Sequence, residues 1–211
     1  RASWSMYKDE YFDAIYKQVI KIPVRGAYHY YSSNVPWKTQ ADFFLGVVKD
    51  KAFHFYVVDY ESGYNNLNGR TIAEASEFVK YIKEQTGKKC LFYFNPNVFN
   101  TYIKPYNYTN WCNTQDVWIA QYPYTLTEEI TQTQPLMPSG LLNWKLWQYG
   151  GADVNFTAGR NAGINYGGGL QGADLNYYNG TIEEMKTFFS VTDTPVIPPV
   201  DPIDPTPPQP I

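Results

Sequence analysis

The chain has 211 residues, a formal net charge of −3 and 44% hydrophobic residues, a composition that excludes a globally disordered protein. Its basic residues are scattered along the sequence without a basic stripe, which argues against a nucleic-acid partner. No run of about 20 apolar residues is present, so the sequence contains no candidate membrane span and we expect no membrane partner.

Strand-like and helix-like segments alternate along most of the chain. Apolar runs predict strands at 24–31, 53–61, 90–95, 117–122, 144–149 and 173–177. Amphipathic patterns predict helices at 9–20, 36–48, 71–85 and 181–189. This alternation indicates an α/β protein with parallel strands and crossover helices. Six strands and a long aromatic-rich second half favour a barrel over an open doubly wound sheet.

Two of the predicted helices carry boundary signals. Thr71 and Glu74 match a capping box at the start of the first, and Gly87 follows its last turn. Thr181 and Glu184 repeat the same capping signature before the final helix.

The composition changes abruptly after the final helix. From Val191 onward, prolines stand at 195, 198, 199, 202, 205, 207, 208 and 210. Such a stretch cannot form a core and is typical of an extended, semi-rigid linker. The sequence therefore predicts a folded domain at 1–190 and a Pro-rich tail at 191–211. The tail either leads to a second module or ends without an attached function.

The strand at 53–61 ends in two carboxylates, Asp59 and Glu61. Because side chains alternate along a strand, these two project to the same face with their backbones roughly 7 Å apart. Glycoside hydrolysis needs such a pair, in which one carboxyl group stays protonated and the other is ionised. In a barrel the chemistry lies at this end of the strands. The alternative is a strand that leads into a solvated acidic turn.

Aromatic residues gather at the ends of several predicted strands. Tyr28 and Tyr30 share one face of their strand, and the runs 118–122 and 144–149 add further rings. If these ends share one rim, aromatic faces would line a polysaccharide cleft around the carboxylates. For any single ring, packing in the core is the alternative.

Other motifs do not indicate a cofactor or a metal. The glycine run at 167–172 matches the dinucleotide fingerprint formally, but it does not open a helix after a strand. His29 and His54 lack metal-ligand spacing, as do Cys90 and Cys112. We therefore expect no cofactor and no metal, and the pattern leaves a disulfide between the two cysteines open.

Seven short segments are more informative as an ordered set than singly. They are RAS (1–3), GAYHY (26–30), QA with FF (40–44), VDYE (58–61), WIAQY (118–122), LWQY (146–149) and DLN followed by YNG (174–180). Together they resemble glycoside hydrolase family 25, the cell-wall muramidases that include many phage endolysins. The resemblance covers about residues 1–190.

The resemblance implies a modified TIM-type (β/α) barrel that hydrolyses the β-1,4 bond between N-acetylmuramic acid and N-acetylglucosamine. Its partner would be the glycan strands of peptidoglycan, and it would act at the bacterial cell wall. A wall-binding module after the linker would suit the proline tail. The alternatives are a barrel that binds wall glycans without cutting them, and a hydrolase of another glycan such as chitin.

Individual roles follow from the same resemblance. Glu61 matches the general acid, and Asp59 matches the assisting carboxylate, which acts as nucleophile or orients the substrate's acetamido group. Asp174 matches the late aspartate of the family better than Asp153 does, because Tyr-Asn-Gly follows it closely. The expected substrate-binding residues are Tyr28, Tyr30, Tyr122, Trp147, Gln148 and Arg1.

The chain departs from the family pattern at its start. Family members begin with a strand that ends in Asp-Val-Ser, and its aspartate lies in the active site. This sequence begins at what resembles the end of the second strand. We therefore expect an upstream segment of roughly 30 residues, about one strand-helix unit, in the parent protein.

Overall fold

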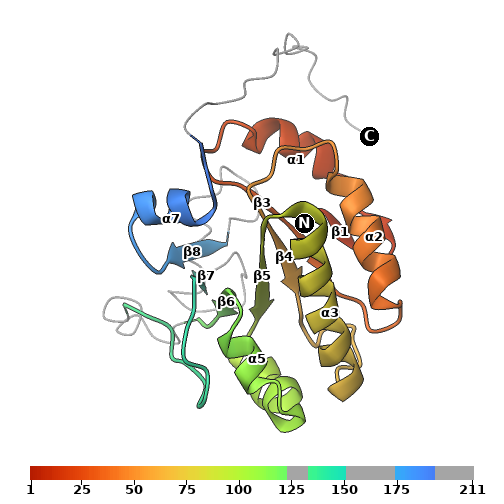
Figure 1. Ribbon diagram of the computed structural model, residues 1–211, viewed down its shortest axis with the longest axis vertical. Helices are drawn as coiled ribbons and strands as arrows, with labels where there is room; N and C mark the ends of the chain where they lie inside the picture. The colour runs from red at the N-terminus through yellow and green to blue at the C-terminus, as the bar shows by residue number, and fades with distance from the viewer. Residues whose placement is uncertain (123–132, 151–173, 193–211) are drawn as a thin grey trace, which may run out of the picture.

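The computed structural model describes residues 1–122, 133–150 and 174–192 (Figure 1). The strands in these ranges are β1 (Ser3–Trp4), β2 (Tyr7–Lys8), β3 (Gly26–Tyr30), β4 (Phe55–Asp59), β5 (Lys89–Phe94), β6 (Val117–Ala120), β7 (Leu146–Gly150) and β8 (Leu175–Tyr178). The helices are α1 (Phe12–Val19), α2 (Trp37–Val48), α3 (Gly69–Thr86), α4 (Pro96–Val98), α5 (Thr109–Asn113) and α7 (Ile182–Phe188). A π-helical turn at Phe99–Ile103 and a 3-10 turn at Lys104–Tyr106 connect α4 to α5.

The strands form one mixed sheet in the order β2-β1-β3-β4-β5-β6-β7-β8. The strands from β1 to β7 in this order are parallel, whereas β2 and β8 pair antiparallel at the two edges. The α/β class is therefore confirmed. The expectation of parallel strands throughout is wrong for β8, whose side chains are exposed or half-buried. An antiparallel edge strand tolerates such one-sided exposure better than a parallel one.

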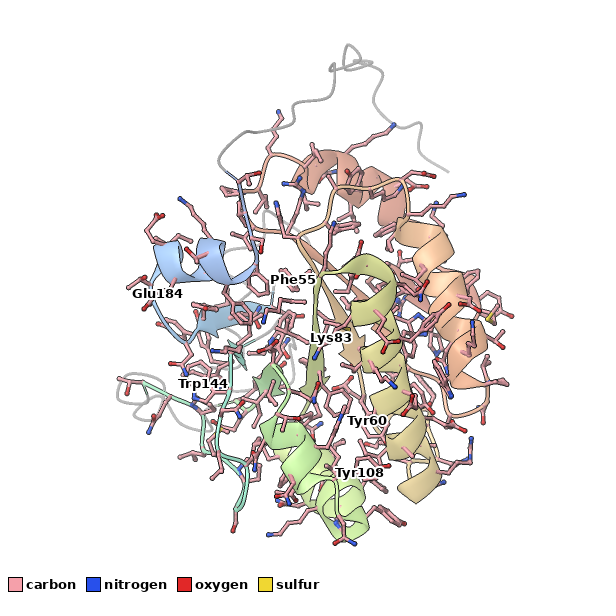
Figure 2. All side chains as sticks on the ribbon, in the orientation of Figure 1. Phe55, Tyr60, Lys83, Tyr108, Trp144 and Glu184 are labelled. Carbon is pink, nitrogen blue, oxygen red and sulfur yellow. The ribbon has the colours of Figure 1, made fainter. Side chains whose placement is uncertain are left out.

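The central strand β4 is buried along its whole length, so its alternating side chains serve two different faces. Tyr56, Val58 and Tyr60 point to the outer face, where α1, α2, α3 and α5 pack around the sheet (Figure 1). Phe55 and Val57 point to the opposite, inner face, where they cluster with residues of β5, β7 and α7. Figure 2 labels Phe55 and Tyr60, one from each face.

Helix α3 begins earlier than the sequence pattern predicts. Its N-cap is Asn68, whose side chain accepts the backbone N–H of Thr71, while the Thr71 hydroxyl accepts the N–H of Asn68. The predicted pairing of Thr71 with Glu74 is therefore wrong, because the reciprocal cap forms one turn earlier. Gly87 ends the helix at φ 65°, a left-handed conformation that glycine adopts without strain.

The capping box predicted for the last helix is present in α7. The Thr181 hydroxyl accepts the N–H of Glu184, whose carboxylate accepts the N–H of Thr181. The cap directs the helix back across the sheet, so that Phe189 is only 3% exposed and stacks on Phe55 with ring centroids 4.1 Å apart. The stack covers the inner face near the amino ends of the strands.

Several sequence predictions lie beyond what the structure describes. The Pro-rich tail falls outside the described residues except for its first two positions, as do Asp153 and the glycine run at 167–172. A closed barrel that lacks its first strand stays a prediction, as does the division into residues 1–190 and 191–211. Within the described ranges, no helix is both long and apolar enough to cross a bilayer.

The stack of Phe189 on Phe55 yields a test of this packing. Phe189→Ala should lower the free energy of unfolding by about 3–5 kcal/mol, because it removes a buried ring and leaves a cavity. Urea denaturation measures the change. Ile182→Ala is the matched control in the same helix, since Ile182 is largely exposed and should change stability by less than about 0.5 kcal/mol. Equal losses in both variants would contradict the packing role of Phe189.

Candidate active site

Asp59 is the last residue of β4 and points to the inner face. It lies between Tyr30 on β3 and Tyr93 on β5 in the strand register, and its carbonyl accepts the N–H of Tyr31. The residue is 8% exposed, and its Oδ1 is buried without a hydrogen-bond partner among the described residues. Burial raises the pKa of Asp59 well above its usual range, and the neighbouring Glu61 carboxylate raises it further.

Glu61 follows on the same face and is half-buried. Burial is the main cause of its raised pKa, and the negative charge of Asp174 adds to the effect. The backbone at Glu61 is held by Asn65, whose amide donates to the carbonyls of Glu61 and Tyr31, each at 2.9 Å. The Asn65 Oδ1 accepts the N–H of Ser33 at 2.8 Å.

Asn65 thus ties the turn after β4 to the segment after β3. Sequence reasoning missed this residue, because an asparagine in a polar turn is common and nothing in the pattern reveals its partners.

Asp174 comes to the same place from the far edge of the sheet. Its charge raises the pKa of both Asp59 and Tyr28. Asp174 precedes β8, which lies four strands from β4 and five from β3. In a flat sheet these separations would be about 19 and 24 Å, at about 4.8 Å per strand, where charges are largely screened. The sheet therefore curls, and its inner face brings the three carboxyl groups into one cluster.

Gln148 and Tyr93 connect this cluster to the sheet. The Tyr93 hydroxyl donates to Gln148 Oε1 at 2.6 Å. The Gln148 side chain also forms a hydrogen bond with Asp174. This bond lowers the Asp174 pKa, but burial has the larger effect and raises it. The pKa of Tyr93 is well above its usual range, through burial first and then the charges of Glu61 and Asp59. Tyr93 was absent from the predicted site, because its run KKCLFYF looks like uniform core.

Tyr28 and Tyr30 lie on the inner face as predicted from their spacing. Burial raises the pKa of Tyr30 to about 12, and Glu61 and Asp59 contribute in that order. A Cβ added to Gly63 would lie 2.5 Å from the Tyr30 hydroxyl oxygen, so glycine at this turn permits the close approach. Both tyrosines therefore border the carboxylates.

The remaining predicted site residues divide into two groups. Tyr122 and Arg1 lie near the carboxylate cluster. Tyr122 is close enough to Tyr93 to raise the Tyr93 pKa. Arg1 forms an ion pair with Asp9 at 3.1 Å, and its positive charge opposes the upward shift of the Asp59 pKa. Trp147, by contrast, is 1% exposed and packs in the outer-face core. Its indole N–H donates to the Gln121 carbonyl at 2.6 Å. Alternation along β7 sends Gln148 to the carboxylates and Trp147 away from them.

The histidine and cysteine side chains take structural positions. His29 is buried on the outer face, where its ring bonds the Ser3 hydroxyl at 2.8 Å and Gln40 Oε1 at 3.0 Å. Burial lowers the His29 pKa to about 4 despite the bond to Gln40. Cys90 and Cys112 are both buried free thiols, so the disulfide left open by the sequence is not formed. Among the described residues, no three histidine, cysteine, aspartate or glutamate side chains are placed so that they could hold one metal ion.

The three carboxyl groups of this cluster all have pKa values raised above their usual range. Like charges and burial both favour retention of protons, and such coupled groups titrate as a set. In such a set a protonated carboxyl group can lie beside an ionised one. This arrangement allows acid-assisted bond cleavage.

The buried Asp59 carboxyl predicts a pH-dependent stability. Its folded pKa is raised, so the folded state binds more protons than the unfolded state, and stability falls as pH rises from the unfolded pKa through the folded one. Asp59→Asn should therefore stabilise the protein at about pH 7, by about 1.4 kcal/mol for each tenfold difference in proton affinity between the folded and unfolded states. The gain should vanish near about pH 3.5, below the unfolded pKa. Urea denaturation at both pH values measures it, and a loss of stability at neutral pH would contradict the assignment.

Comparisons with known proteins find a family and a fold that this chain shares. A family model described as glycosyl hydrolases family 25 matches residues 3–156. The uncharacterized protein YegX of Escherichia coli (strain K12) is 28% identical over 175 residues, a match that covers 82% of this chain and 54% of YegX. The chain thus spans about half the length of this curated relative.

Solved structures share the fold at low identity. The bacterial lysozyme from Streptomyces coelicolor matches with a TM-score of 0.64 at 22% identity, covering 88% of this chain and 82% of that one. A family 25 glycosyl hydrolase from Bacillus anthracis matches with a TM-score of 0.60 at 23% identity, covering 89% and 79%. Since the family model matches well over half of the sequence, the chain belongs to glycosyl hydrolase family 25.

Proposed function

We propose that this protein hydrolyses the β-1,4 bond between N-acetylmuramic acid and N-acetylglucosamine in bacterial peptidoglycan. The observation that carries the proposal is the pair Asp59 and Glu61 at the end of β4, where burial raises the pKa of both carboxyl groups. The family and the description of the Streptomyces coelicolor structure as a lysozyme support this class of substrate.

In this mechanism Glu61 is the general acid. It is less buried than Asp59 and lies beyond the strand end, so it can reach the glycosidic oxygen and donate its proton. Because its pKa is raised, Glu61 keeps its proton to a higher pH than an ordinary glutamate does.

In the same mechanism Asp59 assists cleavage from the side of the sugar ring on which positive charge develops. Developing positive charge favours ionisation of its carboxyl group, which opposes the effect of burial. The anion then acts as nucleophile or orients the acetamido group of the substrate. Both routes fit a carboxylate with one buried oxygen that has no hydrogen-bond partner among the described residues.

The surrounding residues suit a glycan strand. Tyr28, Tyr30 and Tyr122 provide rings on which sugar faces stack, while Gln148 and Arg1 provide donors for sugar hydroxyl and carbonyl oxygens. The negative charge of Asp174 raises the Glu61 pKa, after the larger effect of burial. Together these residues form the proposed substrate cleft.

Three broader features belong to the same proposal. The curl of the sheet supports a barrel, and the proline-rich composition of residues 191–211 suits a linker to a wall-binding module. The place of action would be the bacterial cell wall. A barrel that binds wall glycans without cutting them is the alternative outcome of the first experiment below.

The first test replaces the proposed acid. Glu61→Gln should lower the rate of peptidoglycan digestion by about 10²–10⁴-fold, because general acid catalysis contributes that much, while glycan binding persists. Reducing-end release measures turnover, and sedimentation with insoluble peptidoglycan measures binding. Glu77→Gln is the matched control, since Glu77 lies exposed on α3. Undiminished turnover in Glu61→Gln would exclude Glu61 as the acid, whereas binding without turnover in the unmodified chain would favour the binding barrel.

The second test uses the pH profile. Because Glu61 must be protonated to act, kcat/KM should fall as pH rises through its pKa. Asp174→Asn removes a negative charge that raises the Glu61 pKa, so this falling limb should move to lower pH. The measurement is kcat/KM from acidic to neutral pH for both proteins. A limb that stays in place or moves to higher pH would show that Asp174 does not set the protonation of Glu61.

A further inference from the structure

A cavity of about 810 Å³ lies at the opposite end of the sheet from Asp59. Its lining comes from the residues that immediately precede the parallel strands: Arg25 before β3, His54 before β4, Lys88 before β5 and Asp116 before β6. The last turn of α3 and the segment from Lys186 to Thr192 complete the wall.

The lining is strongly basic although the whole chain has a net charge of −3. Six of the 17 basic residues of the chain line this one cavity, against a single carboxylate, that of Asp116. The basic residues are Lys21, Arg25, Lys83, Lys88, Lys89 and Lys186. They look scattered in the sequence. Arg25, Lys88 and Lys89 come to this edge at the amino ends of parallel strands, whereas Lys21 reaches it from the segment after α1, Lys83 from α3 and Lys186 from α7.

Three of these cations contact only neutral acceptors. Arg25 donates from Nε to the carbonyl of Ala52 at 2.6 Å and from Nη1 to the carbonyl of Ile22 at 3.0 Å. Lys88 donates to the carbonyl of Phe53. Lys83, labelled in Figure 2, donates to Gln115 Oε1 at 2.8 Å. Within the described part of the chain none of the three forms an ion pair, so these contacts fix the positions of the charges without neutralising them.

Two other lining cations pair with carboxylates. Lys186 pairs with Glu183 at 3.1 Å. Asp116 pairs with Lys89 at 3.6 Å. Arg25 lowers the pKa of both Lys88 and His54, in each case after the larger effect of burial. The Arg25 and Lys88 cations are therefore close enough to repel one another. An anion placed between them would relieve this repulsion.

We propose that this cavity binds a phosphate group and is a second ligand site, separate from the carboxylate cluster. A guanidinium and two ammonium groups at fixed positions suit the several acceptor oxygens and the charge of a phosphate. The volume exceeds that of a single phosphate, so a phosphodiester with its flanking polyol also fits. The cavity is bordered by loops and the chain is acidic overall, which disfavours a long nucleic acid.

The test is titration calorimetry on the 211-residue chain at constant ionic strength. Inorganic phosphate should bind saturably, and Lys83→Gln should raise its dissociation constant by about tenfold, the cost expected for one charged hydrogen bond. Arg25→Gln combined with Lys83→Gln should weaken binding further. Lys80→Gln is the matched control, because Lys80 lies one turn away on α3 with an exposed side chain. Its dissociation constant should stay within about twofold of the unmodified protein.

Two further arms identify the source of the phosphate. Poly(glycerol phosphate) that binds more tightly than inorganic phosphate at equal phosphate concentration would assign the site to a phosphodiester polymer, and equal binding would assign it to the free ion. A single-stranded oligonucleotide that binds more tightly than both would overturn the proposal in favour of nucleic acid.

Two results would overturn the assignment of the phosphate site to this cavity. No saturable binding of either phosphate probe by the folded chain would overturn it, as would an equal loss of affinity in Lys80→Gln. Thermal melts followed by circular dichroism confirm that each variant is folded, and Lys83→Gln retains an amide that can still bond Gln115.

Discussion

The burial of β4 on both faces is the constraint on which the rest of the structure depends. The backbone ladder to β3 and β5 sets its register, and strict alternation then assigns each side chain to one face. Tyr56 and Val58 anchor the helices on the outer face, so the same geometry forces Asp59 toward the inner face. A charge there is poorly solvated, and the carboxyl group keeps its proton more strongly as a result.

A network of neutral hydrogen bonds holds the acid cluster in place. Asn65 fixes the turn that carries Glu61, and the Tyr93–Gln148 pair reaches Asp174 from the middle of the sheet. None of these partners carries a positive charge that would lower the pKa values strongly. The network therefore orients the carboxylates while leaving burial and mutual repulsion in control of their protonation.

The sheet also separates charge between its two ends. The carboxyl ends of the strands gather Asp59, Glu61 and Asp174, whereas the amino ends gather the cations of the basic cavity. The acidic end was predictable from sequence, because two carboxylates stand only two residues apart on one strand. The basic end was not, because its cations come from separate loops, helices and a strand, and only the folded topology brings them together.

The same distinction explains other successes and failures of prediction from sequence. The apolar stripe of α3 and the cap of α7 depend on neighbouring residues, and both were predictable. The start of α3 was not, since Asn68 and Thr71 each match a capping residue and only the folded backbone selects between them. The family resemblance assigned Trp147 to the cleft. Because β7 is buried on both faces, its pattern does not reveal the direction of each side chain.

The most direct measurement of the central claim is digestion of purified Gram-positive peptidoglycan by the 211-residue chain, with mass spectrometry of the new reducing ends. The proposed chemistry at Asp59 and Glu61 predicts fragments that end in reducing N-acetylmuramic acid. Fragments that end in reducing N-acetylglucosamine, or no release by the folded chain, would contradict it.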